Sequence, residues 1–292
     1  MALSKKLIKT GDVLVILGIL LVFMVLGSFA DYPISLALHN EHNAFGIALA
    51  AYGQLPVLLC LQIGVALLLL GRNRERKGIG ILQAVIGVVL FLFGALVNVV
   101  MPIEHLEHLP GGRMISLVVG VLLSGVTFFL AYRLSRGADR ASMIRVATVF
   151  ILAILVEMVI INVIKVPWAR PRMRLIAIYP EVTFTPWWAA GSAIKGAIIE
   201  KYSVASNEFR SFPSGHTADA AMAMLLPLVT LLQTKWQGKE RILFYIGAVW
   251  GFLVALSRVI VGAHFVSDTM AGFAVALLVV FAAVRLAFRK PE

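Results

Sequence analysis

The sequence predicts an all-α membrane protein, a polytopic helix bundle with about eight spans. Three observations lead to this fold class. The 292 residues are 60% hydrophobic and 14% charged, whereas a soluble globular chain carries about 25% charged residues. The apolar residues form runs of about 20, the length of a membrane-spanning helix. Basic residues are concentrated in alternate loops between these runs, as the positive-inside rule describes.

Each predicted span is an apolar run bounded by polar or turn-forming residues, and the seventh run is short. The runs cover residues 12–30, 45–71, 78–102, 114–132, 146–164, 216–234, 242–258 and 265–284. The first run lacks a convincing small-residue cleavage site and more spans follow, so we expect it to be retained. No repeat or soluble insertion is evident, and residues 1–292 are predicted to form a single membrane domain.

Loop charge predicts the orientation of these spans. Basic residues gather before the first span, after the last span, and in the segments 72–77, 133–145 and 235–241. The opposite loops 31–44 and 103–113 carry only Arg113. Both termini are therefore expected on the cytoplasmic side of the membrane. Compact loops and the absence of organelle retention signals favour a bacterial plasma membrane.

Residues 165–214 form the only long segment between spans, and it lies on the predicted outer side. It contains Trp187 and Trp188 followed by a moderately apolar run. One interpretation is an interfacial or re-entrant helix over that face. The other is an ordinary loop whose two tryptophans belong to the interfacial aromatic belt.

The net charge of +11 indicates contact with anionic lipid or with a phosphate-bearing substrate. Membrane lipids are therefore expected partners. Nucleic acid is not an expected partner, because the chain has no long basic arm or solvated basic domain. Cys60 is the single cysteine, so an intrachain disulfide is excluded.

Three short segments at span boundaries carry chemistry on the predicted outer side. They are Lys165 to Arg172, Pro213 to His216, and Ser257 to Asp268. The second predicts a helix start, because Ser214 is a favourable N-cap and the first turn leaves backbone N–H groups unpaired. Gly215 has no side chain, so an anion could approach the backbone closely there.

The third segment pairs a histidine with a carboxylate. His264 and Asp268 are four residues apart, so on a helix they would share one face. The carboxylate could then keep one imidazole nitrogen protonated and leave the other free to attack. Lys165, Arg172 and Arg258 add three cations, and an Arg fork binds two phosphate oxygens at once.

Each segment alone also has an ordinary interpretation. Basic residues at a membrane edge usually anchor lipid headgroups, and a histidine at a helix start is usually structural. The occurrence of three such segments, in order and on one side, favours a phosphoryl-transfer site instead.

The chain resembles the type 2 phosphatidic acid phosphatase superfamily, in its membrane lipid phosphatase branch, which shares its active site with bacterial acid phosphatases and vanadium haloperoxidases. The pattern of that family is Lys, six residues, Arg-Pro; then Pro-Ser-Gly-His; then Ser-Arg, five residues, His, three residues, Asp. The match covers about residues 165–268, and its second and third parts are complete. Met173 replaces the usual proline after Arg172. Arg170-Pro171 is an alternative Arg-Pro, and Arg170 is held as a supporting contact.

This resemblance implies a six-helix core, a mechanism and no cofactor or metal. His264 would attack phosphorus and form a phosphohistidine, with Asp268 orienting it. His216 would protonate the leaving alkoxide and later activate water. The phosphate oxygens would be held by the remaining motif residues, which are Lys165, Arg172, Ser214, Gly215 and Arg258.

Two carboxylates near the motifs are possible supporting residues. Glu157 lies inside the fifth predicted span, where a carboxylate is either functional or a protonated packing residue. Asp219 would favour the helix N-terminus or orient a motif residue. The stretch Glu104–His108 has the spacing of metal ligands but is more typical of a solvated loop.

The predicted function is hydrolysis of a lipid phosphate or diphosphate at the extracytoplasmic face. Phosphatidic acid, phosphatidylglycerol phosphate and an isoprenyl diphosphate all fit the motifs. Phosphate transfer between lipids and a small soluble sugar phosphate as substrate are alternatives, and haloperoxidase activity is disfavoured. A lipid transporter or scaffold is the alternative outside enzymes, but intact motif residues argue against it.

Overall fold

In the computed structural model, which describes residues 3–107 and 109–289, every regular element is helical. His108 and Lys290, two residues of the sequence patterns above, lie outside that part. In chain order the elements are α1 (Leu3–Leu7), α2 (Thr10–Leu38), α3 (Ala44–Tyr52), α4 (Leu55–Leu70), α5 (Lys77–Val100), α6 (Ile103–Leu106), α7 (Gly112–Ser135), α8 (Arg140–Trp168), α9 (Met173–Ile178), α10 (Lys195–Tyr202), η1 (Ser206–Phe209), α11 (Gly215–Ala221), η2 (Met222–Leu231), η3 (Thr234–Trp236), α12 (Glu240–Ile260) and α13 (Val266–Ala287).

Seven stretches of helix in the described residues are long and apolar enough to cross a membrane, which confirms a polytopic helix bundle. The predicted span 216–234 is built differently, because it consists of the short helix α11 followed by the 3-10 helix η2. Pro227 inside η2 has no N–H to donate to an α-helical ladder. At rises of about 1.5 and 2.0 Å per residue, α11 and η2 together extend about 30 Å, the thickness of the hydrocarbon layer.

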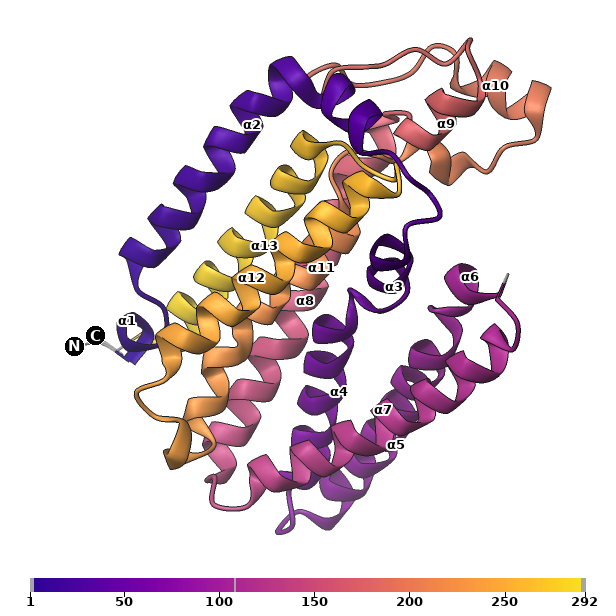
Figure 1. Cartoon of the computed structure of the whole chain (residues 1–292). Helices are drawn as coiled ribbons and strands as arrows, with labels where there is room; N and C mark the ends of the chain where they lie inside the picture. The colour runs from indigo at the N-terminus through magenta and orange to yellow at the C-terminus, as the bar shows by residue number, and fades with distance from the viewer. Residues whose placement is uncertain (1–2, 108, 290–292) are drawn as a thin grey trace.

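The α11–η2 segment lies in the centre of the bundle, and four spanning elements, α4, α8, α12 and α13, pack against it. Met222, Leu225 and Leu228 are completely buried and join one large apolar core. Helix α12 packs along η2, α13 packs between α2 and α8, and α4 closes the bundle against α8. Figure 1 shows these helices running side by side, with α1 and the end of α13 at one end.

Helices α5 and α7 form a hairpin at the periphery, packed chiefly against each other and against α4 (Figure 1). Their outer faces are apolar and exposed, as Leu92, Phe93 and Leu122 illustrate, which suits contact with lipid tails. Inside the contact, Asn98 donates hydrogen bonds to Gln62 and Ser124 at 2.8 and 3.1 Å. Such interhelical bonds hold membrane helices together where the hydrophobic effect cannot.

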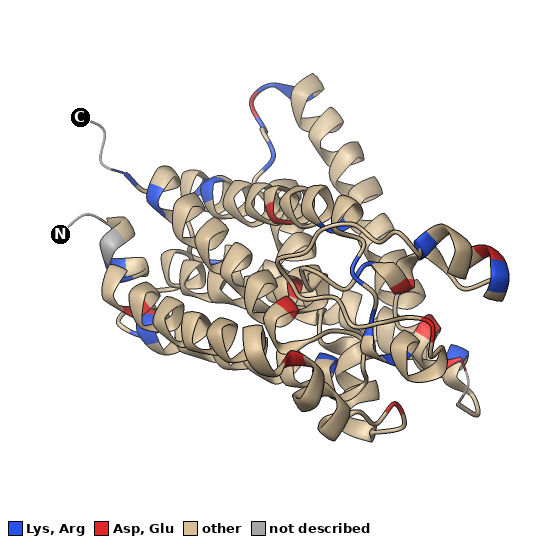
Figure 2. Ribbon diagram, turned by 90° about the horizontal axis from the view of Figure 1, so that it is seen from above, with Lys and Arg blue, Asp and Glu red and all other residues tan. Residues whose placement is uncertain are grey.

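Residues 169–213 form a cap over one end of the bundle, with α9 and α10 at its edge (Figure 1). The cap has a small apolar core of its own, made by Leu175, Val182, Ile198 and Phe209. The segment is therefore a loop with short helices rather than one interfacial helix. Figure 2 shows charged positions mainly in loops and at helix ends, with long uncharged stretches between them.

Candidate active site

The structure brings the three sequence segments together beneath the cap. Lys165 lies in the last turn of α8, and Ser214 is the N-cap of α11 as predicted. Arg258 lies in the last turn of α12. The backbone N–H of Ser214 donates to the carbonyl of Asp268 at 2.9 Å, which joins the second segment directly to the third.

His264 is buried in the loop between α12 and α13. Its Nδ1 lies 2.6 Å from the backbone carbonyl of Ser211, and that carbonyl can only accept a hydrogen bond. The proton therefore sits on Nδ1, and Nε2 keeps a free lone pair. Burial, followed by the charges of Lys165, Arg172 and Arg258, lowers the pKa of His264 well below its usual 6.5. The geometry thus presents a neutral imidazole with an available nucleophilic nitrogen.

The expectation that His264 and Asp268 share a helix face is wrong. Helix α13 begins only at Val266, with Phe265 as its N-cap, so His264 precedes the helix. Asp268 occupies the first turn and its carboxylate accepts the backbone N–H of Phe265 at 2.8 Å. An acidic side chain in the first turn caps the start of a helix. This cap defines where α13 begins, so that His264 lies in the loop before the helix.

Asp268 is connected to His264 mainly through Ser211. Its Oδ2 lies 3.9 Å from His264 Nδ1, beyond hydrogen-bond distance, but accepts the Ser211 hydroxyl at 2.5 Å. Ser211 in turn supplies the carbonyl that holds His264. The carboxylate therefore fixes the segment that orients the imidazole.

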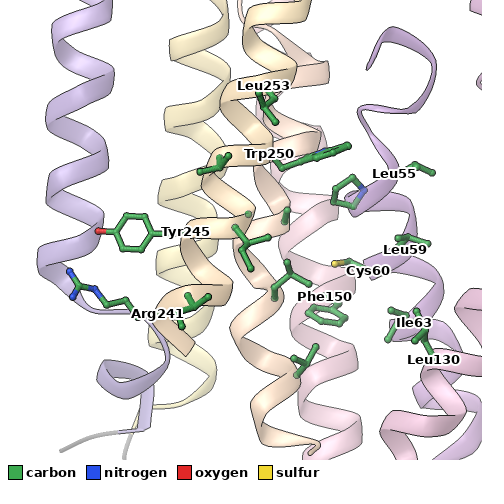
Figure 3. A pocket seen from close by; sticks show the side chains of 18 residues that line it. Leu55, Leu59, Cys60, Ile63, Leu130, Phe150, Arg241, Tyr245, Trp250 and Leu253 are labelled. Atoms are coloured by element: carbon green, nitrogen blue, oxygen red, sulfur yellow. The ribbon is translucent and has the colours of Figure 1, made fainter. Parts of the chain in front are cut away.

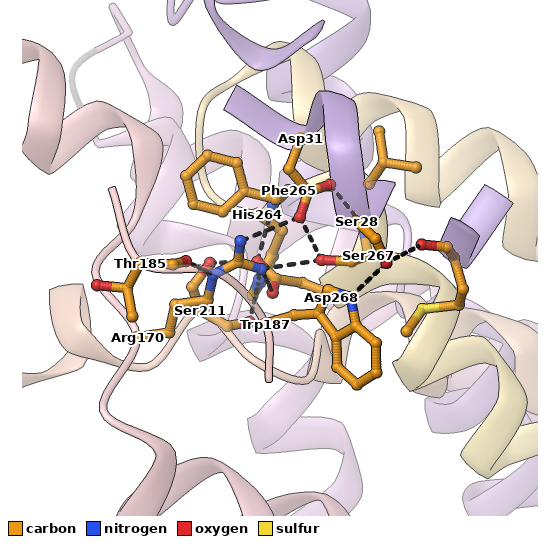
Figure 4. A network of polar contacts seen from close by, with 12 residues as sticks. Ser28, Asp31, Arg170, Thr185, Trp187, Ser211, His264, Phe265, Ser267 and Asp268 are labelled. Atoms are coloured by element: carbon orange, nitrogen blue, oxygen red, sulfur yellow. Dashed lines mark hydrogen bonds and ion pairs between the residues drawn. The ribbon is translucent and has the colours of Figure 1, made fainter. Parts of the chain in front are cut away.

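Arg170 is completely buried at the centre of a polar network (Figure 4). Its Nε donates to the Thr185 carbonyl at 2.7 Å, and its two terminal nitrogens form ion pairs with Asp31 at 3.0 Å and with Asp268. The guanidinium also lies 4.3 Å from the centroid of the Phe265 ring. Because its donors have these partners, Arg170 joins α2, the cap and α13 instead of offering free donors to a ligand.

Arg258 and Arg172 differ from Arg170, since they have buried N–H groups without hydrogen-bond partners among the described residues. These groups are Nε and Nη1 of Arg258 and Nε of Arg172. Arg258 is only 2% exposed. Leaving a buried guanidinium donor unpaired is costly, so such groups are typical of a site that binds an anion.

Lys165 and Gly215 lie at the same place. A Cβ added to Gly215 would be 3.3 Å from Lys165 Nζ, so any larger residue would crowd the ammonium group. Ser214 keeps the start of α11 in order by accepting hydrogen bonds from Thr217 N and Oγ1 at 3.4 and 3.0 Å.

Two further residues contact the site. One packs against His216, and the other pairs with two of the arginines. His105 of α6 packs edge-on against His216, with ring centroids 6.0 Å apart. Glu208 pairs with Arg174, and with Arg172 at 3.6 Å. Burial opposes ionisation of Glu208, but the hydrogen bond from Arg174 and the charges of both arginines lower its pKa overall.

An acidic pair, of which Glu157 is buried and Asp219 half-buried, lies next to Lys165. Glu157 and Asp219 interact with each other, and Lys165 attracts both. Asp219 also accepts a hydrogen bond from the side chain of Gln54, the residue that precedes α4. The two predicted supporting carboxylates are thus neighbours on α8 and α11.

Sequence reasoning missed Asp31, Ser211, Glu208, His105 and Glu104. Asp31 had a usable signal, because a carboxylate inside an apolar span is a functional candidate by default. The prediction of a solvated loop at Glu104–His105 is wrong for His105, since His105 lies in α6 and is half-buried against His216. Among the described residues, no group of three His, Cys, Asp or Glu side chains is arranged as a metal site.

The chain is similar in sequence to known proteins. A family model described as the PAP2 superfamily matches residues 146–292. A stretch of 75 residues is 36% identical to phosphatidylglycerophosphatase B of Bacillus subtilis (strain 168), covering 24% of this chain and 36% of that protein. The match therefore spans about a third of the relative's length. No solved structure matches the chain.

Proposed function

The chain belongs to the PAP2 superfamily, the superfamily of type 2 phosphatidic acid phosphatases, and on this basis we propose that it removes phosphate from a membrane lipid. The observation that carries this proposal is the placement of buried Arg donors, which have no hydrogen-bond partner in the described part of the chain, beside a histidine whose Nε2 keeps its lone pair. Arg258, Arg172, Lys165 and the start of α11 would hold the phosphate oxygens.

The reaction proceeds in two steps. Nε2 of His264 attacks phosphorus, the bond from phosphorus to the lipid oxygen breaks, and His216 donates a proton to that oxygen. Water then attacks the phosphohistidine while His216 takes a proton from it, and inorganic phosphate leaves. The cations stabilise the charge on the equatorial oxygens, so the proposed mechanism needs no metal ion.

An apolar groove supports a lipid as the substrate. It has a volume of about 980 Å³ and is lined by α4, α8, η2 and α12, as Figure 3 shows. Leu55 lines it and directly follows Gln54, which bonds Asp219 beside Lys165. A hydrocarbon tail could occupy this groove while the headgroup lies at the cations. The name of the Bacillus relative favours phosphatidylglycerol phosphate among the candidate lipids.

The decisive experiment is phosphate release by the purified protein in detergent with excess EDTA. Substrates are phosphatidic acid, phosphatidylglycerol phosphate, an isoprenyl diphosphate and glucose 6-phosphate. We expect release from a lipid, and a loss of at least about 1000-fold in His264→Ala. His42→Ala is the matched control, because His42 is 90% exposed in a loop and should leave the rate unchanged.

Other outcomes separate the alternatives. Release that EDTA abolishes would contradict the metal-free mechanism. Transfer of a radiolabelled phosphate group from one lipid to another, without release of free phosphate, would indicate a phosphotransferase. Folded protein with no reaction on any substrate would favour a transporter or scaffold.

A further inference from the structure

The short helix α6 carries the tip of the peripheral α5–α7 hairpin to the candidate active site. Leu106 is buried, and α6 packs against α3 and α7, so its position is defined by the fold. The hairpin lies outside residues 146–292, the part of the chain that the family model matches. The family motifs therefore assign no role to α6.

His105 is the residue of α6 that lies beside His216. The two rings meet edge-on at an interplanar angle of 72°. In the proposed function, which this inference rests on, His216 protonates the leaving oxygen. His105 therefore lies on the leaving-group side of the substrate, next to the residue that protonates the leaving oxygen.

Glu104 precedes His105 and attracts Arg172, Arg174 and Arg258. Its side chain is exposed, and it takes part in no ion pair with another described residue. Glu208 differs, because it pairs with Arg172 and Arg174 directly. Glu104 thus lies near enough to these arginines to attract them without forming an ion pair with any of them.

We propose that Glu104 and His105 form a headgroup subsite that selects the leaving group of the substrate. A carboxylate and an imidazole there accept hydrogen bonds from a hydroxyl group, such as the free hydroxyl of a terminal glycerol. They disfavour an isoprenyl diphosphate, because its second phosphate is bonded directly to the leaving oxygen and would place its charge beside Glu104, whereas the phosphodiester of phosphatidylglycerol phosphate is separated from the leaving oxygen by the glycerol. The subsite therefore favours phosphatidylglycerol phosphate over an isoprenyl diphosphate.

The charge effect is tested with Glu104→Gln, assayed for kcat/KM on these two lipids. The variant should shift the ratio about tenfold toward the diphosphate, because it removes one negative charge near the leaving group. Glu107→Gln is the matched control on the same loop, where Glu107 forms an exposed ion pair with Arg113 at 3.5 Å. It should leave the ratio at the wild-type value.

The hydrogen-bonding role is tested with His105→Phe, which retains an aromatic ring against His216. The variant should lower kcat/KM for phosphatidylglycerol phosphate about tenfold, because the glycerol hydroxyl loses a partner. Phosphatidic acid has no free hydroxyl on its leaving group, so its kcat/KM should fall much less. A purely structural role of α6 would lower both values together.

The outcomes distinguish this inference from the proposed function. Active wild-type protein whose substrate ratios are unchanged in Glu104→Gln and His105→Phe would overturn the subsite alone. Equal losses on all lipids in both variants would also overturn it. Wild-type protein without activity on any phospholipid or diphosphate would overturn the proposed function, and the subsite with it.

Discussion

The imidazole of His264 is oriented by a backbone carbonyl, and two carboxylates act on it at a distance. Ser211 connects His264 to Asp268, and Arg170 connects Asp268 to Asp31. Each buried charge in this series has an opposite charge in contact, which is the condition for keeping ions inside a protein. The imidazole of His264 is thus held by a series of buried contacts, as the proposed nucleophile requires.

The pH dependence of the reaction should report the state of His264. Attack requires the neutral imidazole, and kcat/KM falls as pH drops through the pKa of the free enzyme's His264. Because burial and the neighbouring cations lower that pKa well below 6.5, activity should persist below pH 6.5. In Lys165→Met the loss of one cation should raise the pKa and move the acid limb to higher pH. Identical acid limbs in the two proteins, measured on one substrate, would contradict this assignment.

Glu157 and Asp219 should respond differently to amide substitution. Two carboxylates in contact cannot both ionise in a buried setting. Neither oxygen of Glu157 has a hydrogen-bond partner within the described residues, whereas Asp219 accepts a hydrogen bond from Gln54, so we expect Glu157 to be the protonated member. Glu157→Gln should therefore keep turnover within about twofold, and Asp219→Asn should lower kcat/KM about tenfold because Lys165 loses its counter-charge. The reverse order in an assay of both variants would assign the charge to Glu157.

At the scale of elements, the start of α11 depends on close packing by α13. Gly272 of α13 lies against the Ser214 backbone, and a Cβ added there would be 3.0 Å from the Ser214 carbonyl carbon. The Ser214 N–H is itself bonded to the Asp268 carbonyl. Helix α13 therefore positions both the Ser214 turn, which is proposed to bind phosphate, and the segment that bears His264.

Gly272→Ala should consequently impair catalysis by displacing the Ser214 turn. A shift of about 1 Å at a catalytic site can cost about 100-fold in rate. Gly125→Ala is the matched control in α7, since no atom lies within 4 Å of a Cβ placed there. That variant should keep full activity, with stability unchanged or raised by up to about 1 kcal/mol. Equal activity of the two variants would show that the α13 contact is unimportant.

At the scale of the molecule, the candidate site lies at one end of the bundle, and α1 and the C-terminal end of α13 lie at the other end (Figure 1). Apart from the α5–α7 hairpin, the described residues form six spanning elements. This number equals that of the six-helix core implied by the family resemblance. The hairpin is thus additional to these six elements, and its connecting helix α6 lies at the candidate active site.

Orientation can be tested with a thiol reagent that does not cross membranes. Cys60 is buried and should not react, so the wild-type protein is the control. Glu200→Cys in α10 should be labelled in intact cells, because the positive-inside rule places the cap outside. Arg74→Cys, between α4 and α5, should be labelled only after permeabilisation. The opposite pattern would place the active site in the cytoplasm.

The sequence by itself determined the helical membrane fold, the positions of the long spans and the residues of the three motifs. Apolar runs and motif spacing are local properties, which a chain retains whatever its tertiary arrangement. The N-cap role of Ser214 followed from the same local rules.

Only the tertiary structure decided the partners of those residues. The Arg170 contacts with Asp31 and Asp268 join residues 139 and 98 positions apart. The placement of His105 beside His216 depends on how the α5–α7 hairpin packs against α4. Such contacts are set by the packing of whole helices, and no local pattern encodes which side chains that packing brings together.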